Sequence, residues 1–551
     1  LNKTQRVERA FEEWEPKSTS GLAYMHHRGK IPIVNETIGQ VLTRAAETWP
    51  NRECIVSVHQ NIRLTFIEML RRSDRLAAAL KKLGMKKGDR LGIWGPNDVE
   101  WFISSMAAAR GGFVLVAINP AYQSGELIYS LQKVGVKTVI APCTFKTQNY
   151  AQMLLDAKQH CPTLEHIIIY SQDHFPARSS GTRRFADVEA IPSNIEVSAV
   201  AAEHSAVSCH DGCNIQFTSG TTGKPKATFI SHRSIVNNSG QAVRRLELNE
   251  ERRICFNMPF FHAFGLLMGN IAVLHSGGTL VLENRSFDPI KSLEVILKEK
   301  CDVTYGTPTM WVSSNYSTMD SPSTKIGKTT ISQRIKEMIY GLTETTGIVF
   351  QSLPGESAEL AENTVGHLSD HVEAKVVDEN GQTLPFGSPG ELWTRGYTTM
   401  LHYWGDEENT KKSITEDGWL KTGDRFILER NGYGRVIGRN KDMLIRGGEN
   451  IFPREVEDFL MTHPLIVEAQ VIGAHDDVYG EEICACLRLR DGASLTPDQL
   501  KSYCKGKIAH FKIPRYVVIV DEYPKTASGK VQKFALKEQM ERKGVIPTPP
   551  S

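Results

Sequence analysis

The sequence predicts an α/β protein with a large N-terminal region of parallel βα sheets, a small β-rich subdomain and a small α+β C-terminal domain. The chain has 551 residues, which is too many for one compact core, so several domains are expected. Helical and strand patterns alternate over residues 37–141. Short β-branched runs, broken by Gly, Pro and Asp-Gly turns, fill residues 366–438 and predict the β-rich subdomain.

The N-terminal elements alternate in type. Residues 64–84 place apolar side chains at helical spacing and end at Gly84, which predicts a helix. The next patterns predict a strand, a helix and two strands: RLGIWGPN (90–97), EWFISSMAAARGG (100–112), FVLVAINP (113–120) and VKTVIAP (136–142). This alternation predicts a mostly parallel sheet covered by helices. Residues 171–211 show a poorer pattern and are expected to be a connecting surface segment.

Later patterns place further elements in the same way. Strands are predicted at NIQF (214–217) and ATFI (227–230), with a helix beginning near Ser231. We divide the chain into an N-terminal domain, 1–438, and a C-terminal domain, 439–551. The second is predicted to contain REVEDFLMTH (454–463) as a helix, EAQVIGAH (468–475) as a strand, a helix from Thr496 and RYVVIV (515–520) as a strand.

Composition excludes several classes of protein. The chain has 65 basic and 63 acidic residues, a net charge of +2, which does not favour binding to nucleic acid or to a membrane surface. No apolar run reaches the length that a bilayer span needs. The ten cysteines lack paired spacing, and their two small clusters (Cys209 and Cys213 with His210; Cys484 with Cys486) indicate structural thiols in a reducing compartment rather than a metal site.

One stretch predicts a site for phosphate. Residues 215–232 read IQFTSGTTGKPKATFISH, with hydroxyls at Thr218, Ser219, Thr221 and Thr222, flexible Gly220 and Gly223, and cations at Lys224 and Lys226. Glycines let backbone N–H groups turn toward an anion. A Walker A loop is excluded because Pro225 follows Gly-Lys and Thr218 stands where the first glycine is required. The interpretation is a phosphate clasp between strands; composition alone also fits a polar surface turn.

The string TSGTTGKPK, with further motifs in order, resembles the adenylate-forming family of acyl-CoA synthetases, peptide-synthetase adenylation domains and luciferases. The other motifs are MPFFHAFG (258–265), YGLTETT (340–346), WLKTGD (419–424), GRNKDMLIRGGENI (438–451) and PKTASGK (524–530). Stretches such as YGTPTM and GEEICAC are similar to a mitochondrial medium-chain branch of the synthetases. The resemblance implies an acid–thiol ligase that uses ATP, Mg²⁺ and CoA to convert a fatty acid to acyl-adenylate and then to a thioester.

The resemblance also implies roles for individual residues. Lys530 is the expected catalytic cation, Thr343 bonds the α-phosphate, and Glu344 lies near Mg²⁺, which prefers oxygen ligands. Tyr340 is expected to stack on adenine. Asp424 suits the ribose diol with Arg439 assisting, although an ordinary Asp-Gly turn is the alternative. His262 is expected between the acyl pocket and ATP, although an isolated histidine beside aromatic residues is usually a packed core residue. The ATP residues together are Thr218, Ser219, Gly220, Thr221, Thr222, Gly223, Lys224, Pro225, Lys226, Tyr340, Asp424, Arg439 and Lys530.

The C-terminal domain is implied to be a mobile lid. Lys441 matches the hinge about which it rotates, and Gly447 with Gly448 is expected to line the path of the pantetheine arm, where a side chain would obstruct. Residues 260–263 supply no acid for a substrate amine, so an amine-free carboxylate fits. The chain shows no carrier-protein segment, so free CoA is the expected acceptor and the partners are small molecules.

Two departures from the family pattern leave alternatives open. Ala227 stands where the family has glycine, which a negative φ would tolerate. Residues 307–340 are shorter than in the family and lack the Gly-Gly-Ala-Pro turn that contacts adenine, with its strand and helix. A catalytically impaired homologue and an adenylating enzyme with another acceptor are therefore alternatives. The resemblance implies the mitochondrial matrix, with the cytoplasm as the alternative; the chain begins at Leu1, not Met, and the oligomeric state stays open.

Overall fold

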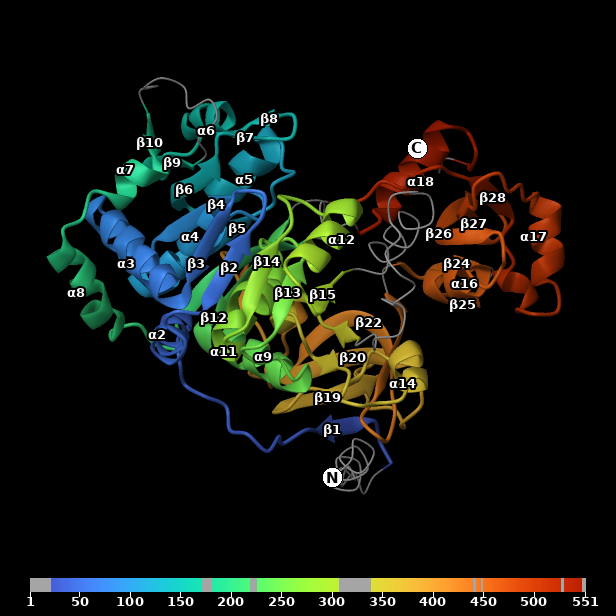
Figure 1. Ribbon diagram of the computed structural model, residues 1–551. Coiled ribbons are helices and arrows are strands. Elements are labelled where there is room, and N and C mark those ends of the chain that lie inside the picture. The colour runs from blue at the N-terminus through green and yellow to red at the C-terminus, as the bar shows by residue number, and fades with distance from the viewer. Residues whose placement is uncertain are drawn as a thin grey trace. The chain divides into compact units, whose positions relative to one another are not determined.

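The computed structural model describes residues 21–170, 181–218, 225–306, 338–439, 442–446, 449–526 and 530–547. These residues divide between two compact units. The larger unit contains the described residues of His26–Glu373 and Thr394–Leu420, and the smaller unit those of 21–25, Ala374–Trp393 and Lys421–Ser551. Each unit is described below by itself, and Figure 1 labels the elements of both.

The larger unit contains an eight-stranded sheet in the order β10-β9-β6-β4-β5-β11-β12-β21. All pairs from β10 to β11 are parallel, whereas β12 and β21 join antiparallel. The strands are β10 (Thr182–Arg184), β9 (His166–Tyr170), β6 (Val136–Pro142), β4 (Arg90–Trp94), β5 (Val114–Ile118), β11 (Gly212–Thr218), β12 (Lys226–Ser231) and β21 (His402–Tyr403). The predicted parallel α/β sheet is therefore confirmed.

A five-stranded and a three-stranded sheet complete the larger unit's main framework. The first has the order β15 (Val303–Tyr305), β13 (Arg253–Phe256), β14 (Thr279–Leu282), β2 (Glu53–Ser57) and β3 (Ile62–Thr65), with β3 antiparallel. The second is antiparallel: β16 (Ile339–Tyr340), β17 (Phe350–Gln351) and β18 (His367–Leu368). A two-stranded ribbon pairs β7 (Thr144–Phe145) with β8 (Gln148–Asn149).

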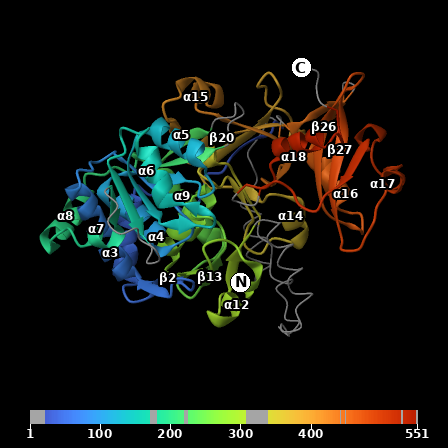
Figure 2. The ribbon, with the colours of Figure 1, turned by 90° about the horizontal axis from the view of Figure 1, so that it is seen from above.

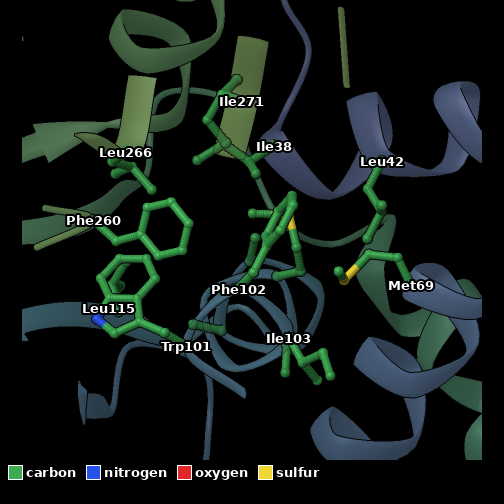
Figure 3. Close-up of a cluster of buried hydrophobic side chains, with 14 of the residues drawn as sticks. Ile38, Leu42, Met69, Trp101, Phe102, Ile103, Leu115, Phe260, Leu266 and Ile271 are labelled. Carbon is green, nitrogen blue, oxygen red and sulfur yellow. The ribbon is translucent and has the colours of Figure 1, made fainter. Parts of the chain in front are cut away.

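Apolar faces of the helices form the core of this unit. In α3 (Phe66–Lys82), Thr65 and Glu68 make a capping box at the start, and Gly84 lies just past the end with φ +94°. Figure 3 shows side chains of α2 (Ile38–Thr48), α3, α4 (Val99–Gly111) and η1 (Leu266–Ile271) meeting in one cluster. Trp101, Phe102 and Ile103 of α4 are fully buried in it. Removing this apolar area from water is the main force that holds the layers together.

The remaining helices of the larger unit connect or cover the strands. They are α5 (Ser124–Val134), α6 (Tyr150–Lys158), α7 (Phe185–Glu189), α8 (Asn194–His204), α9 (His232–Arg245), α10 (Ala263–Gly265), α11 (Ala272–Ser276), α12 (Pro289–Lys298), η3 (Thr343–Thr345), α14 (Ala358–Asn363) and α15 (Glu407–Ser413). In both views, α3, α7 and α8 lie side by side (Figures 1 and 2).

The smaller unit contains most of a second five-stranded sheet and the whole of a third. The second has the order β1 (Tyr24–His26), β19 (Val372–Val377), β20 (Gly390–Gly396), β22 (Leu420–Leu428) and β23 (Gly434–Arg439). The third pairs β25 (Glu449–Ile451), β24 (Leu444–Arg446), β27 (Gly480–Leu489) and β26 (Ile466–Asp476), with β28 (Tyr516–Ile519) also on β27. Its helices are α16 (Pro453–Leu460), α17 (Pro497–Cys504), η5 (His510–Lys512) and α18 (Lys533–Arg542).

The elements predicted from the sequence are found, with one correction. The patterns at 64–84, 90–97, 100–112, 113–120 and 136–142 correspond to α3, β4, α4, β5 and β6, and those after residue 439 to α16, β26, α17 and β28. The segment expected to be a surface connection instead contains β10, α7 and α8 in its described part. Ser193 and Glu196 make a capping box that starts α8, a signature present in the sequence.

The domain boundary at 438/439 remains a prediction. Of the strands in 366–438, β18 belongs to the three-stranded sheet and β21 to the eight-stranded sheet, whereas β19, β20, β22 and β23 pair with one another in the second five-stranded sheet. Among the described residues, no helix is long and apolar enough to cross a membrane.

Candidate functional site

The predicted phosphate loop connects two paired strands. β11 and β12 are antiparallel, and their pairing ends at Thr218 opposite Lys226. Ser219, Gly220, Thr221, Thr222, Gly223 and Lys224 lie outside the described residues. The Pro225 carbonyl accepts a hydrogen bond from the Tyr129 hydroxyl at 3.1 Å. The described ends of the loop thus belong to two antiparallel strands, whereas a Walker A loop is followed directly by a helix.

The substitution at Ala227 is accommodated by the hairpin. Ala227 lies in β12 opposite Phe217, and it is buried. An extended strand has a negative φ, so glycine's conformational freedom is not required there.

The motif YGLTETT forms a tight loop between β16 and β17. Tyr340 ends β16, and its carbonyl accepts from the Val349 amide at 2.8 Å. The 3₁₀ turn η3 (Thr343–Thr345) carries Thr343 and Glu344 at the tip. The backbone carbonyl of Glu344 accepts from the Met400 amide at 2.9 Å. These bonds fix the backbone on which both side chains stand.

The Glu344 carboxylate lies beside the end of the phosphate-loop strand. The Tyr403 hydroxyl donates to Glu344 Oε1 at 2.9 Å, and the Thr218 hydroxyl donates to the same oxygen at 3.4 Å. Burial, and then the nearby Glu344 charge, raise the pKa of Tyr403, so the phenol stays a neutral donor. The structure therefore brings together three segments that are far apart in the sequence: 218, 344 and 403.

Tyr403 is a residue beside Glu344 that the sequence analysis missed. It belongs to β21, which pairs with β12, and the Lys226 ammonium lies 4.8 Å from its ring centroid. Its relation to Glu344 and Lys226 depends on sheet pairing between distant segments. The string LHYWGD carries no local signal of that pairing.

The chemistry around Glu344 fits a phosphate-bridging Mg²⁺. A carboxylate and nearby hydroxyls are hard oxygen donors, and Mg²⁺ commonly takes one or two carboxylates and completes its shell with water and substrate phosphates. In the part of the chain that the structure describes, no cluster of three or more His, Cys, Asp or Glu residues could hold a metal by itself. A cation at Glu344 would therefore take most of its ligands from outside these residue types, such as water and substrate phosphate.

His262 stands at the start of a helical run rich in aromatic neighbours. It is the N-cap residue of α10, and its ring lies 5.3 Å from that of Phe261. Asn97 holds the preceding residues, donating to the Met258 carbonyl and accepting from the Phe260 amide, both at 2.8 Å. The run continues into the π-helix η1, a feature that often marks functional sites. The half-buried His262 is thus held at a defined place.

Asp424 and Arg439 pair within the smaller unit. They are opposite each other on β22 and β23, and Arg439 Nε lies 2.9 Å from Asp424 Oδ1. Asp424 is only 2% exposed, and its amide bonds the Thr422 hydroxyl at 3.1 Å. Asp424 is therefore a strand residue held by a guanidinium, and not part of an isolated surface turn. The arrangement supports the expected partnership of these two residues.

Lys530 also lies in the smaller unit, where its backbone is bonded to Thr526. The Thr526 amide bonds the Lys530 carbonyl at 2.8 Å, and the Lys530 amide bonds the Thr526 hydroxyl at 3.1 Å. Lys530 is exposed. Lys441, Gly447 and Gly448, the expected hinge and CoA-path residues, lie outside the described residues.

Sequence comparison identifies the family. The profile of the AMP-binding enzyme family matches residues 42–404, and that of the AMP-binding enzyme C-terminal domain matches residues 455–530. The chain belongs to the AMP-binding enzyme family. The mitochondrial medium-chain acyl-CoA ligase ACSF2 of Rattus norvegicus is 41% identical, with 96% of this chain and 91% of the relative aligned. The human protein of that name is also 41% identical, with 95% and 90% aligned.

Solved structures share the fold of this chain. A crystal structure of the anthranilate CoA ligase AuaEII with anthranoyl-AMP has a TM-score of 0.81 at 24% identity, covering 94% of this AMP-binding enzyme and 99% of that chain. A fatty acyl CoA synthetase of Mycobacterium tuberculosis has a TM-score of 0.65 at 26% identity, covering 92% and 99%. The predicted family and fold class are confirmed, and so is the predicted enzyme class, an acid–thiol ligase.

The alignment to the rat ligase contains gaps in this chain. The match to the rat ligase runs over 563 residues, more than the 551 of this enzyme, so the relative has residues that this enzyme lacks. The family's adenine-contacting turn is absent from the sequence between residues 307 and 340, and residues 307–337 lie outside the described residues. β15 and β16 flank that segment, and each is a terminal strand of its sheet in the described structure.

Proposed function

We propose that this enzyme joins a medium-chain fatty acid to CoA in two steps. The fatty-acid carboxylate attacks the α-phosphorus of ATP, the bond to the β-phosphate oxygen breaks, and pyrophosphate leaves. The CoA thiol, losing its proton, then attacks the acyl carbon of the adenylate, and AMP leaves. The observation that carries this proposal is the contact of Glu344 with Thr218, because it joins the phosphate-loop hairpin to the carboxylate expected near magnesium.

The residues of the larger unit are proposed to hold ATP and the acid. The hairpin loop, with Thr218, Pro225 and Lys226 at its described ends, binds phosphate, Thr343 bonds the α-phosphate, and Tyr340 contacts adenine. Mg²⁺, when bound, would neutralise phosphate charge, and Glu344 would supply its carboxylate oxygen. His262 positions the carboxylate.

The residues of the smaller unit are proposed to complete the reaction. Asp424, held by Arg439, accepts hydrogen bonds from the ribose hydroxyls. Lys530 stabilises the charge that develops at the α-phosphate. Lys441 is the hinge for the second step, and Gly447 and Gly448 line the path of the pantetheine arm. CoA is proposed as the acceptor.

The names of the relatives support a proposal for the acyl chain length and the compartment. The ACSF2 proteins are named mitochondrial medium-chain ligases. We infer the same substrate class and the mitochondrial matrix, with the cytoplasm as the alternative. The substrates are small molecules, and nucleic acid is not a partner in this proposal.

A direct assay tests the activity. Folded enzyme with octanoate, ATP and Mg²⁺ is expected to release pyrophosphate, and addition of CoA is expected to give octanoyl-CoA. Release without thioester formation would favour another acceptor. No release with any carboxylate would favour an impaired homologue, the alternative that the short segment at residues 307–340 leaves open.

Lys530 provides the test of mechanism. Lys530→Ala is expected to slow adenylation by about 10²–10³-fold, because it removes a cation aimed at developing charge. Equal losses in adenylation and in thioester formation from preformed acyl-adenylate would contradict the role assigned to Lys530. Lys543→Ala, at an exposed lysine after α18, is the matched control and is expected to change neither step.

A further inference from the structure

Two neighbouring asparagines of α9 form hydrogen bonds with the backbone of two different segments. Asn237 accepts from the Val34 amide and donates to the Val34 carbonyl, both at 2.8 Å. Asn238 accepts from the Ile348 amide at 3.1 Å and donates to the Ile348 carbonyl at 2.7 Å. A carboxamide offers the same donor and acceptor as a peptide group. Each asparagine therefore pairs with one residue as a neighbouring strand would.

Asn238 makes its two hydrogen bonds to the loop that carries Thr343 and Glu344. Ile348 lies near the end of that loop, next to Val349, whose amide closes it against Tyr340. Asn238 is 1% exposed, and Ile348 is also 1% exposed. Removal of the carboxamide would leave a buried amide and a buried carbonyl without this partner, which is costly because water cannot readily replace it.

The loop itself is strained. Thr346 has φ +61°, in the left-handed region that is uncommon for a non-glycine residue. Its hydroxyl donates to the Thr398 carbonyl at 2.6 Å. The two ends of the turn also approach closely, since a Cβ built on Gly341 would lie 2.2 Å from the Gly347 carbonyl oxygen. Such a conformation persists only where the surroundings hold it at several points.

The helix that carries Asn238 continues directly from the phosphate-loop hairpin. β12 ends at Ser231, and α9 begins at His232. A fixed helix therefore links the strand that holds the phosphate loop to the loop that holds Glu344. The Tyr403 hydroxyl and the Met400 amide hold Glu344 itself, whereas Asn238 holds the returning end of its loop.

We propose that Asn238 is a positioning residue for adenylation, and that it acts through Ile348 to fix Thr343 and Glu344 relative to the phosphate-loop hairpin. This inference rests on the proposed function. It assigns Asn238 no contact with substrate. It predicts an effect on the first step, which uses Thr343 and Glu344, and none on thioester formation from a preformed adenylate.

The neighbouring residue Asn237, which makes the same pair of hydrogen bonds to Val34, supplies a matched control. Asn238→Ala is expected to slow adenylation by about 10- to 100-fold, the effect of losing a two-bond buried contact, and to raise the Mg²⁺ concentration needed for half-maximal rate. Asn237→Ala removes the same chemistry from the same helix at a half-exposed segment and is expected to change adenylation by less than about twofold. Asn238→Ser, whose hydroxyl is too short to bridge both groups, replaces the alanine variant if that variant does not fold.

Two results would overturn the proposal. One is adenylation by folded Asn238→Ala or Asn238→Ser within about twofold of wild type. The other is an equal loss in both half-reactions, which would indicate a general structural role.

Amide hydrogen exchange gives a readout independent of activity. Exchange over residues 341–349 is expected to rise about tenfold or more in the Asn238 variant and not in Asn237→Ala. Unchanged exchange would refute the positioning role even if the enzyme proved inactive, whereas inactive wild type alone would refute only the proposed function.

Discussion

Single hydrogen bonds decide how the carboxylate of Glu344 is presented. Its Oε1 accepts from both Tyr403 and Thr218, so the side chain is oriented from β21 and from β11 at once. A charged acceptor makes such bonds stronger than neutral ones. The orientation of Glu344 is therefore set before any substrate binds, which lowers the cost of organising the site during the reaction.

Tyr403→Phe tests this orientation. The change removes the hydroxyl and keeps the ring against Lys226, so adenylation is expected to fall by about tenfold, the loss of one hydrogen bond to a charged group. The Mg²⁺ concentration for half-maximal rate is expected to rise in parallel. Pyrophosphate release measured over a Mg²⁺ titration checks both. Thioester formation from preformed adenylate is expected to stay unchanged.

Tyr150→Phe is the control for Tyr403→Phe. Tyr150 is also buried, and its hydroxyl bonds the Pro120 carbonyl, away from Glu344. An equal fall in adenylation in both variants, or an unaltered Mg²⁺ requirement in Tyr403→Phe, would contradict the role assigned to Tyr403.

At the scale of elements, the helical run after His262 packs so closely against the preceding turn that Gly265 has no room for a side chain. Gly265 lies where α10 meets η1, and a Cβ there would lie 1.8 Å from the Pro259 carbonyl oxygen. The obstruction is backbone, which cannot rotate aside. The turn from Pro259 to His262 and the helix start must therefore move together if any side chain is added at this position.

Gly265→Ala is expected to destabilise the protein by about 1–3 kcal/mol, a typical cost of overpacking. The displaced turn is also expected to raise KM for the fatty acid, because His262 moves with it. Thermal unfolding and acid-dependence kinetics measure the two effects. Gly125→Ala is the matched control in α5: nothing lies within 4 Å of the added methyl, so stability is expected to stay equal or to rise slightly. An unshifted Tm in Gly265→Ala would contradict the packing argument.

Elements with a strong local pattern could be predicted from the sequence. α3 was predictable because its apolar spacing and its glycine terminator coincide, and the strands from β4 to β6 because they are short apolar runs between helices. α8 was missed because its apolar residues do not form a distinct stripe: Ile195 is 83% exposed, and Val200 is buried. Glu344, Asp424 and Lys530 could be named only because family motifs surround them. Tyr403 and Asn238 could not, since sheet pairing and helix packing alone bring them to their partners.

At the scale of the whole molecule, several histidines are buried as neutral groups. Burial, in each case the largest cause, lowers the pKa of His204 to about 4 and those of His232, His275 and His367 to about 3. In the unfolded state each histidine has a pKa near 6.5, so below that pH it binds a proton that the buried, folded-state histidine does not bind. Stability is therefore full above about pH 6.5 and is lost as the pH falls toward these lower values. Glu283 acts oppositely, because burial raises its pKa to about 8, so its contribution grows as the pH falls toward 4.5.

Acid unfolding tests whether the histidines outweigh Glu283. Each histidine contributes a slope of up to about 1.4 kcal/mol per pH unit, so the free energy of unfolding is expected to fall steeply between about pH 6.5 and 5. His232→Asn is expected to reduce this slope by up to about 1.4 kcal/mol per pH unit, because asparagine does not bind a proton in this range. The Asn Oδ1 can replace His232 Nδ1 as acceptor from the Ile38 amide, which lies 3.3 Å from that nitrogen in the native protein. Denaturant unfolding at a series of pH values measures the free energy of unfolding and hence this slope. His210→Asn, at an exposed position, is expected to keep the native slope. A His232→Asn profile parallel to that of the native protein would show that His232 is not among the groups that link protonation to unfolding.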